Sequence, residues 1–213
     1  MRFFLLLSCL LLLPVLFPSS GYGAVSTQEI MGRLQAAYRD VKDITLDFTQ
    51  KSAIEGFEEK VFEGRLYLKK TEQVRWDYLR PVKQNIYISG DKVILYLPEE
   101  RQAIVQTLSG HPDAEPAMGL LTNIEKWNDL FFIRGDGEEG DFFKIELRPK
   151  TMLLIEKVLV GIHKETHYIS RLTLFEKSGN RVSFYFSNIK TNSGLKDSLF
   201  DFKIPKGTEI LEY

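Results

Sequence analysis

The stretch FEGRLYLKKTEQVRWDY, residues 62–78, alternates apolar and polar side chains with a period of two. Successive side chains of a strand point to opposite faces of a sheet, so this period predicts two strands with one apolar face each. The connection between them is short, which is typical of a hairpin. The apolar members of this stretch are Phe62, Leu66, Leu68, Val74, Trp76 and Tyr78.

The same period continues on both sides of this hairpin and predicts about eleven strands in a meander. Turns rich in glycine and polar residues separate the strands, with examples at residues 89–92, 135–137 and 178–180. No internal repeat or linker indicates a second domain. The other expected strands cover residues 44–48, 86–88, 93–97, 102–108, 131–134, 141–147, 154–163, 167–176 and 181–188.

Helical signals are few and short. Ser26 and Glu29 have the spacing of a capping box and open an amphipathic helix over residues 26–39. Pro116 stands where proline is favoured, at the first position of an apolar helix over residues 116–124. One more helical turn is expected over residues 195–200. The apolar side chains of the central helix include Met118, Leu120 and Leu121.

A sheet with one apolar face must cover that face. A closed barrel, a second sheet and overlying helices are the possible solutions. The apolar surface of the expected helices is small for a sheet of this size. The pattern therefore leaves two readings open, an apolar cavity under a helical lid and a well-filled core without a cavity.

Composition excludes several classes of protein. Lys and Arg number 28 against 29 Asp and Glu, giving a formal net charge of −1. A nucleic-acid-binding protein normally carries a large basic surplus, so we expect no nucleic-acid partner. Hydrophobic residues make up 44% and charged residues 27%, which is typical of an ordinary globular domain. No disulfide or metal is needed to stabilise a chain of this length.

The first residues have the layout of a secretory signal peptide. An apolar run over residues 3–17 follows Arg2 and precedes small and helix-breaking residues. We expect cleavage after Gly23, which leaves residues 24–213 as a single exported domain without cysteine, because Cys9 lies in the leader. An uncleaved anchor helix is the alternative, although the run is short for a membrane span. Cys9 precedes most of the apolar run, so we do not expect it to be acylated.

Signatures of catalysis are missing from the sequence. It contains no Gly-x-Ser-x-Gly elbow. The glycines of residues 135–140 alternate with acidic residues, which would repel phosphate, and predict a hairpin turn. His163 and His167 are four residues apart, but between two strands they predict a hairpin tip and not a zinc site. We therefore expect no enzyme activity, no catalytic residue, no cofactor and no metal site.

Several short motifs together resemble one known family. In order and spacing they are similar to the LolA family of periplasmic carriers of outer-membrane lipoproteins, over nearly the whole mature chain. The matching residues are Asp47-Phe48-Thr49-Gln50, Gly64-x-Leu66, Arg75-Trp76, Pro81, Gln84, Gly90-Asp91, Tyr96-x-Pro98, Gln102, Pro116 and Phe200-x-Phe202-x-x-Pro205-x-Gly207.

The resemblance implies a mainly β fold with short α-helices, an incomplete, half-open antiparallel β-barrel of about eleven strands covered by a helical lid. It also implies a monomeric periplasmic chaperone that takes triacylated lipoproteins from an inner-membrane ABC transporter. The carrier shields their acyl chains and delivers them to an outer-membrane lipoprotein receptor. Because no acylated cysteine is expected here, the chain resembles the soluble carrier and not the anchored receptor.

Strand alternation and the lid helix together nominate a cavity lining. One departure from the family concerns the lid. The family usually has Arg-Pro before its Arg-Trp strand, where the resemblance implies that the arginine holds the lid, and these positions are Lys70 and Thr71 here. Lysine offers a point charge in place of a planar fork, so Lys70 is a candidate lid clasp of altered strength. The expected acyl-chain lining is Phe48, Leu66, Val74, Trp76, Ile86, Leu95, Met118, Leu120 and Leu121.

Two other functions stay open on the sequence alone. A related half-barrel could bind a different lipid or sense envelope proteins without extracting lipoproteins from a membrane. A secreted hydrolase could assemble a carboxylate pair from distant strands, although nothing in the sequence nominates such a pair.

Overall fold

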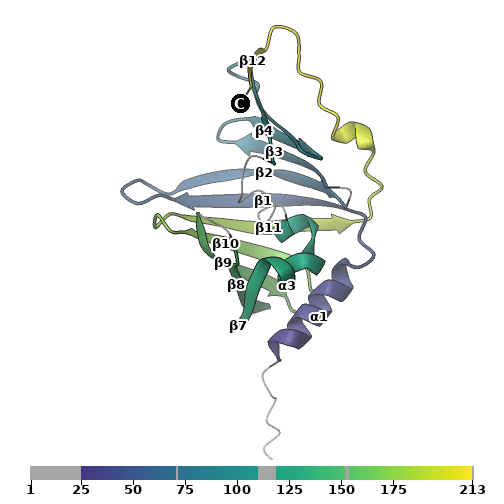
Figure 1. Ribbon diagram of the computed structural model, residues 1–213, viewed down its shortest axis with the longest axis vertical. Coiled ribbons are helices and arrows are strands. Elements are labelled where there is room, and N and C mark those ends of the chain that lie inside the picture. The colour runs from purple at the N-terminus through teal and green to yellow at the C-terminus, as the bar shows by residue number, and fades with distance from the viewer. Residues whose placement is uncertain (1–24, 71, 110–118, 152–153, 213) are drawn as a thin grey trace, which may run out of the picture.

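The computed structural model describes residues 25–70, 72–109, 119–151 and 154–212 (Figure 1). Within them, twelve strands form one sheet in the order β12-β6-β5-β4-β3-β2-β1-β11-β10-β9-β8-β7. The strands are β1 (Asp43–Ala53), β2 (Lys60–Lys69), β3 (Gln73–Arg80), β4 (Gln84–Ser89), β5 (Lys92–Leu97), β6 (Gln102–Thr107), β7 (Phe131–Glu139), β8 (Phe142–Pro149), β9 (Ile155–His163), β10 (Ile169–Glu176), β11 (Arg181–Thr191) and β12 (Glu209–Glu212).

The sheet is open, with β7 at one edge and β12 at the other. Two antiparallel meanders, β1 to β6 and β7 to β11, meet where β1 pairs with β11. These findings confirm the predicted mainly β, incompletely closed fold. The strand added to the expected eleven is β12, which pairs with β6 in parallel. In the sheet β12 lies far from β11, the strand before it in the chain, so the segment from β11 to β12 passes along the sheet (Figure 1).

Short helices accompany the sheet: α1 (Thr27–Tyr38), η1 (Ile124–Lys126), α3 (Trp127–Leu130) and η2 (Asp197–Leu199). The expected amphipathic helix is confirmed as α1. Its N-cap is Ser26, whose hydroxyl accepts the backbone N–H of Glu29 at 3.2 Å. Residues 119–122 are also helical, at the end of the predicted central helix. None of the described helices is long and apolar enough to cross a membrane.

One predicted turn was wrong. Residues 135–137 do not end a strand, because β7 continues to Glu139 through an irregular register between Gly135 and Glu138. A bulge accommodates extra residues within a strand, and the positive φ of 83° at Gly137 suits glycine there. The chain turns instead at residues 140–141.

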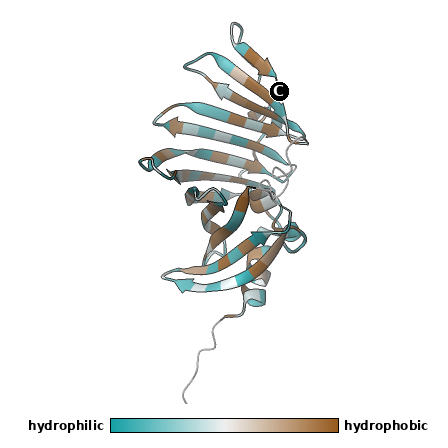
Figure 2. Cartoon of the chain, turned by 60° about the vertical axis from the view of Figure 1, so that its left-hand side comes forward, coloured by the Kyte–Doolittle hydropathy of each residue, from teal (hydrophilic) through white to brown (hydrophobic). Residues whose placement is uncertain are grey.

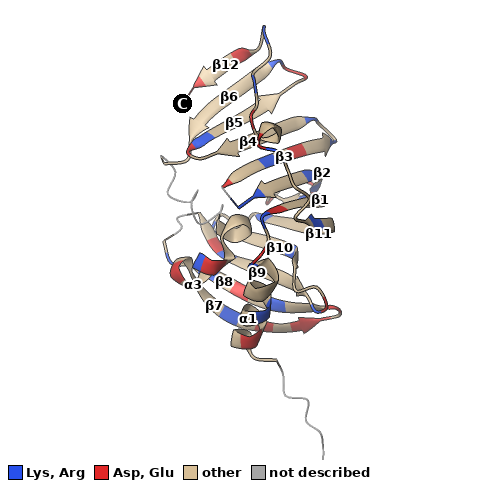
Figure 3. Cartoon of the chain, turned by 90° about the vertical axis from the view of Figure 1, so that its right-hand side faces the viewer, with Lys and Arg blue, Asp and Glu red and all other residues tan. Residues whose placement is uncertain are grey.

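Each face of the sheet carries its own hydrophobic cluster. We call the face toward α1 and α3 the inner face; Figure 3 shows these helices in front of β7 to β10. Leu34 of α1 and Trp127 of α3, both 0% exposed, belong to the large inner cluster. On the outer face a smaller cluster of Tyr87, Ile94 and Ala103 packs against Phe202, in the segment before β12. Alternating hydropathy along the strands is visible in Figure 2.

Candidate functional site

Strand register aligns five apolar side chains across the inner face. Residues directly opposite each other on neighbouring strands place their side chains on the same face. Leu66 of β2 lies opposite Trp76 of β3, which lies opposite Ile86 of β4. Ile86 lies opposite Leu95 of β5, and Leu95 opposite Ile104 of β6. We call these five residues the apolar row.

Burial changes along the apolar row. Leu66 is fully buried, whereas Trp76, Ile86, Leu95 and Ile104 are only half-buried. Neighbouring strands are about 4.8 Å apart, so the half-buried part spans roughly 14 Å from β3 to β6. One leaflet of a bilayer has a hydrocarbon depth of about 15 Å, half of the roughly 30 Å core. The half-buried part therefore matches the extent of an acyl chain in a membrane leaflet.

An aromatic cluster centred on Phe48 borders the apolar row. The Phe48 ring meets those of Trp76 and Tyr78 edge-on, with centroids 5.3 and 5.0 Å away. Phe184 of β11 lies 5.3 Å from Trp76. Gly64 makes room for this packing, because a Cβ there would lie 2.7 Å from the Phe48 ring and 2.0 Å from a backbone oxygen. Only glycine fits at that position of β2.

The inner face becomes polar toward one end of its central strands. The Tyr78 hydroxyl donates to the Gln50 side-chain oxygen at 2.7 Å, and the Gln50 amide donates to Ser52 at 2.9 Å. Gln84 lies opposite Tyr78 on β4. Burial raises the pKa of Tyr78, so its hydroxyl stays a neutral donor. We call Gln50, Ser52, Tyr78 and Gln84 the polar end; at the opposite end of β1 to β4, which we call the apolar end, lie Ile44, Leu68, Val74 and Ile88.

The helical segment 119–122 packs on the inner face. Leu120 is 3% exposed and belongs to the inner cluster, while Leu121 is half-buried against it. The Trp127 indole N–H donates to the Gly119 carbonyl at 3.0 Å, which ties this segment to α3. Met118, the third residue predicted for the lid, lies outside the described residues.

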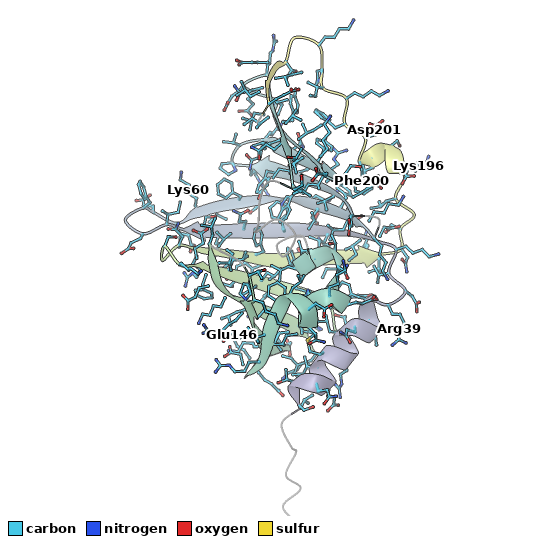
Figure 4. All side chains as sticks on the ribbon, viewed as in Figure 1. Arg39, Lys60, Glu146, Lys196, Phe200 and Asp201 are labelled. Atoms are coloured by element: carbon cyan, nitrogen blue, oxygen red, sulfur yellow. The ribbon has the colours of Figure 1, made fainter. Side chains whose placement is uncertain are left out.

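Lys70, at the end of β2, contacts two helical elements at once. Its Nζ donates to the Arg39 carbonyl, at the C-cap of α1, at 2.9 Å. The same Nζ lies 3.8 Å from the Glu125 carboxylate of η1. A cation at a helix C-terminus satisfies a carbonyl that has no partner within the helix. Figure 4 shows Arg39 at the end of α1.

Residues 39–203 match a protein family described as outer membrane lipoprotein carrier protein LolA. The chain belongs to the LolA family. It is 29% identical over 205 residues to the outer-membrane lipoprotein carrier protein of Methylococcus capsulatus, covering 95% of this chain and 96% of that one. The carrier protein of Pseudomonas putida is 26% identical over 191 residues, covering 89% and 91%.

Among solved structures, an uncharacterised conserved protein from Thermus thermophilus superimposes with a TM-score of 0.57. The match covers 87% of this chain and 98% of that protein, at 15% identity, and so concerns the fold alone. Family and curated relatives are named as carriers and not as enzymes, which agrees with the predicted lack of enzyme activity.

Set against the LolA resemblance, the structure brings most of the nominated residues together. Register places the six strand residues, Phe48, Leu66, Val74, Trp76, Ile86 and Leu95, on one face. Their contact with acyl chains stays a prediction, as does the role of Lys70 as a clasp. Within the described ranges no His, Cys, Asp or Glu side chains gather as metal ligands.

Sequence reasoning missed the polar end of the inner face. Its signal was present, because Gln50 and Ser52 continue the period of two beyond Phe48 on the same side of β1. The bond between Tyr78 and Gln50 joins residues 28 positions apart, which periodicity within one strand cannot reveal.

Proposed function

We propose that the protein is a periplasmic carrier of triacylated lipoproteins. As a monomer, it receives them from an inner-membrane ABC transporter and delivers them to an outer-membrane lipoprotein receptor. The observation that carries this proposal is the half-buried part of the apolar row. The predicted leader over residues 1–23 supports export, and membership of the LolA family supports the cargo.

The energetics of an acyl chain explain why such a surface is needed. Each CH₂ group left in water costs roughly 0.8 kcal/mol, so three chains do not leave a membrane without a protein to cover them. The half-buried residues of the apolar row lose their remaining contact with water when acyl chains lie on them. Because these residues are already partly covered, the gain on binding is moderate, and this favours release to a receptor that binds more tightly.

A release assay tests the proposal. Purified protein comprising residues 24–213 is mixed with spheroplasts that hold a newly made triacylated lipoprotein and the matching transporter. We expect lipoprotein in the supernatant as a one-to-one complex with the protein. No release by the wild-type protein, with the transporter active, would leave a lipid-binding or sensing relative in place of a carrier.

Paired variants connect the assay to the apolar row. Leu95→Glu places a charge among the half-buried residues, and we expect it to abolish release. Its control is Tyr185→Glu, because Tyr185 is 42% exposed and lies opposite Thr49, on the side of β1 away from Phe48. Equal release by both variants would show that the apolar row is not the binding surface.

A further inference from the structure

The indole N–H of Trp76 is buried, yet it has no hydrogen-bond partner in the part of the chain that the structure describes. The other tryptophan differs, because the Trp127 N–H donates to a backbone carbonyl at 3.0 Å. A buried donor without an acceptor is costly and rare in folded proteins. Trp76 therefore needs an explanation beyond packing.

Trp76 stands at a boundary in the proposed site. Along β3 its inner-face neighbours are Val74, toward the apolar end, and Tyr78, in the polar end. Across the sheet it is the first half-buried member of the apolar row, next to fully buried Leu66. Trp76 thus lies where an amphiphile on this face would change from hydrocarbon to polar atoms.

We propose that the Trp76 N–H donates a hydrogen bond to the carbonyl oxygen of a bound acyl chain, in an ester or an amide linkage. The inference rests on the proposed function and adds an orientation to it. The hydrocarbon lies over the half-buried apolar row, the acyl carbonyl meets Trp76, and the remaining head group faces Gln50 and Tyr78. An acyl carbonyl supplies the missing acceptor, whereas a plain hydrocarbon chain does not.

The orientation follows from the pairing of polar groups. At the polar end Tyr78, Gln50 and Ser52 already bond to one another and can also contact a glyceryl or peptide head group. Trp76 is an indole, which donates only, so it selects an acceptor. It does not select among head groups, and it therefore suits a carrier whose cargo shares only its acylated end.

The test compares two soluble lipids that differ only at the linkage. Dioctanoylglycerol carries two ester carbonyls, and di-O-octylglycerol has the same glycerol and the same number of chain carbons but ether linkages. Calorimetric titration of the wild-type protein is expected to show about ten-fold tighter binding of the ester, the usual effect of one buried hydrogen bond. Trp76→Phe keeps an aromatic ring and removes the donor. It is expected to bind both lipids equally.

The matched control is Tyr78→Phe, which removes a donor that already has a partner, and it should keep the ester preference. A short peptide with an N-octanoyl group provides an amide carbonyl. The affinities of dioctanoylglycerol and of this peptide are each compared between the wild type and Trp76→Phe. The larger loss identifies whether the ester or the amide carbonyl accepts the bond.

Equal binding of ester and ether by the wild-type protein would overturn the inference, and this comparison needs no variant. Loss of the preference in Tyr78→Phe but not in Trp76→Phe would also overturn it. Both results would leave the proposed function standing, because acyl lipids would still bind. Failure of the wild-type protein to bind either lipid would overturn the acyl-binding function itself.

Discussion

The two parts of the inner face share one hydropathy pattern but differ in burial. In β1, β2 and β8 to β11 most apolar inner-face residues are buried, and Leu66, Ile145 and Val158 are 0% exposed. In β3 to β6 the members of the apolar row are half-buried, and the small cluster of β4 to β6 lies on the outer face. Helices α1 and α3 pack with the first part. The comparison shows that alternation specifies a face, while the helices decide which half of it becomes core.

Truncation of one apolar-row residue in each part should show the largest difference. Leu66→Ala is expected to lower the free energy of unfolding by about 3 to 4 kcal/mol, because it opens a cavity in closed packing. Leu95→Ala removes the same atoms from a half-buried site and should cost less than about 1.5 kcal/mol. Urea unfolding measures both. Equal losses would contradict the division of the inner face.

Addition of one methyl group tests the packing between the two parts. Gly64→Ala is expected to lower the free energy of unfolding by about 2 to 3 kcal/mol, because its Cβ would overlap the Phe48 ring and a backbone carbonyl. In Gly32→Ala the Cβ meets nothing within 4 Å in the middle of α1. That control should raise stability by about 0.5 to 1 kcal/mol. An unchanged free energy of unfolding in Gly64→Ala would mean that the Phe48 ring does not lie over Gly64.

A charge on the lid segment tests its part in covering the apolar row. Leu120→Glu is expected to weaken binding of an acyl lipid about ten-fold, since a carboxylate cannot stay among apolar side chains. Far-UV circular dichroism should show an intact sheet, because the change lies in a helical segment. Phe132→Glu is the control, as Phe132 is 66% exposed on edge strand β7. Unchanged binding in folded Leu120→Glu would count against the lid assignment.

Removal of the Lys70 charge should have a small effect on stability. Lys70→Met loses the bond to the Arg39 carbonyl and the pairing with Glu125, which are both well exposed, so the cost should be under about 1 kcal/mol. If Lys70 is a lid clasp, stopped-flow mixing will show faster acyl-lipid binding in this variant. Lys70→Arg keeps the cation, so its rate should not rise above that of the wild type. An unchanged rate in Lys70→Met would remove the clasp role and leave a helix cap.

The smallest effect concerns pH and the outer face of the well-packed part. Glu146 of β8, labelled in Figure 4, is 4% exposed. Its burial raises its pKa, but the hydrogen bond from Arg148 and the charges of Arg134, Arg148 and Lys157 outweigh burial, so the pKa lies below the ordinary 4.5. The stabilisation is therefore complete above about pH 4.5 and is lost as the pH falls through the lowered pKa.

Glu146→Gln removes the titrating carboxyl. We expect its free energy of unfolding to fall less steeply than that of the wild type between about pH 4.5 and pH 3. Unfolding in urea at several pH values measures the slopes. Identical slopes in the two proteins would show that Glu146 does not contribute to acid sensitivity.

Features that depend on residues close together in the chain could be predicted from the sequence. These include α1, the hairpins and the shared face of the nominated strand residues. Ser26 shows why, because its capping bond joins residues three apart. The bulge after Gly135 and the parallel pairing of β12 escaped prediction. A glycine-rich stretch has the same composition whether the strand bulges there or ends in a turn. The pairing of β12 joins it to a strand about 100 residues earlier.

The order of amino acids was enough to specify the period of two, and hence an apolar face, because side-chain direction in a strand depends only on the backbone. Tertiary packing alone determined the use of that face. Leu66 and Leu95 have the same side chain on the same face, yet one is fully buried and the other half-buried. The difference arises because burial depends on which distant segments pack over each strand, and that is a property of the whole fold.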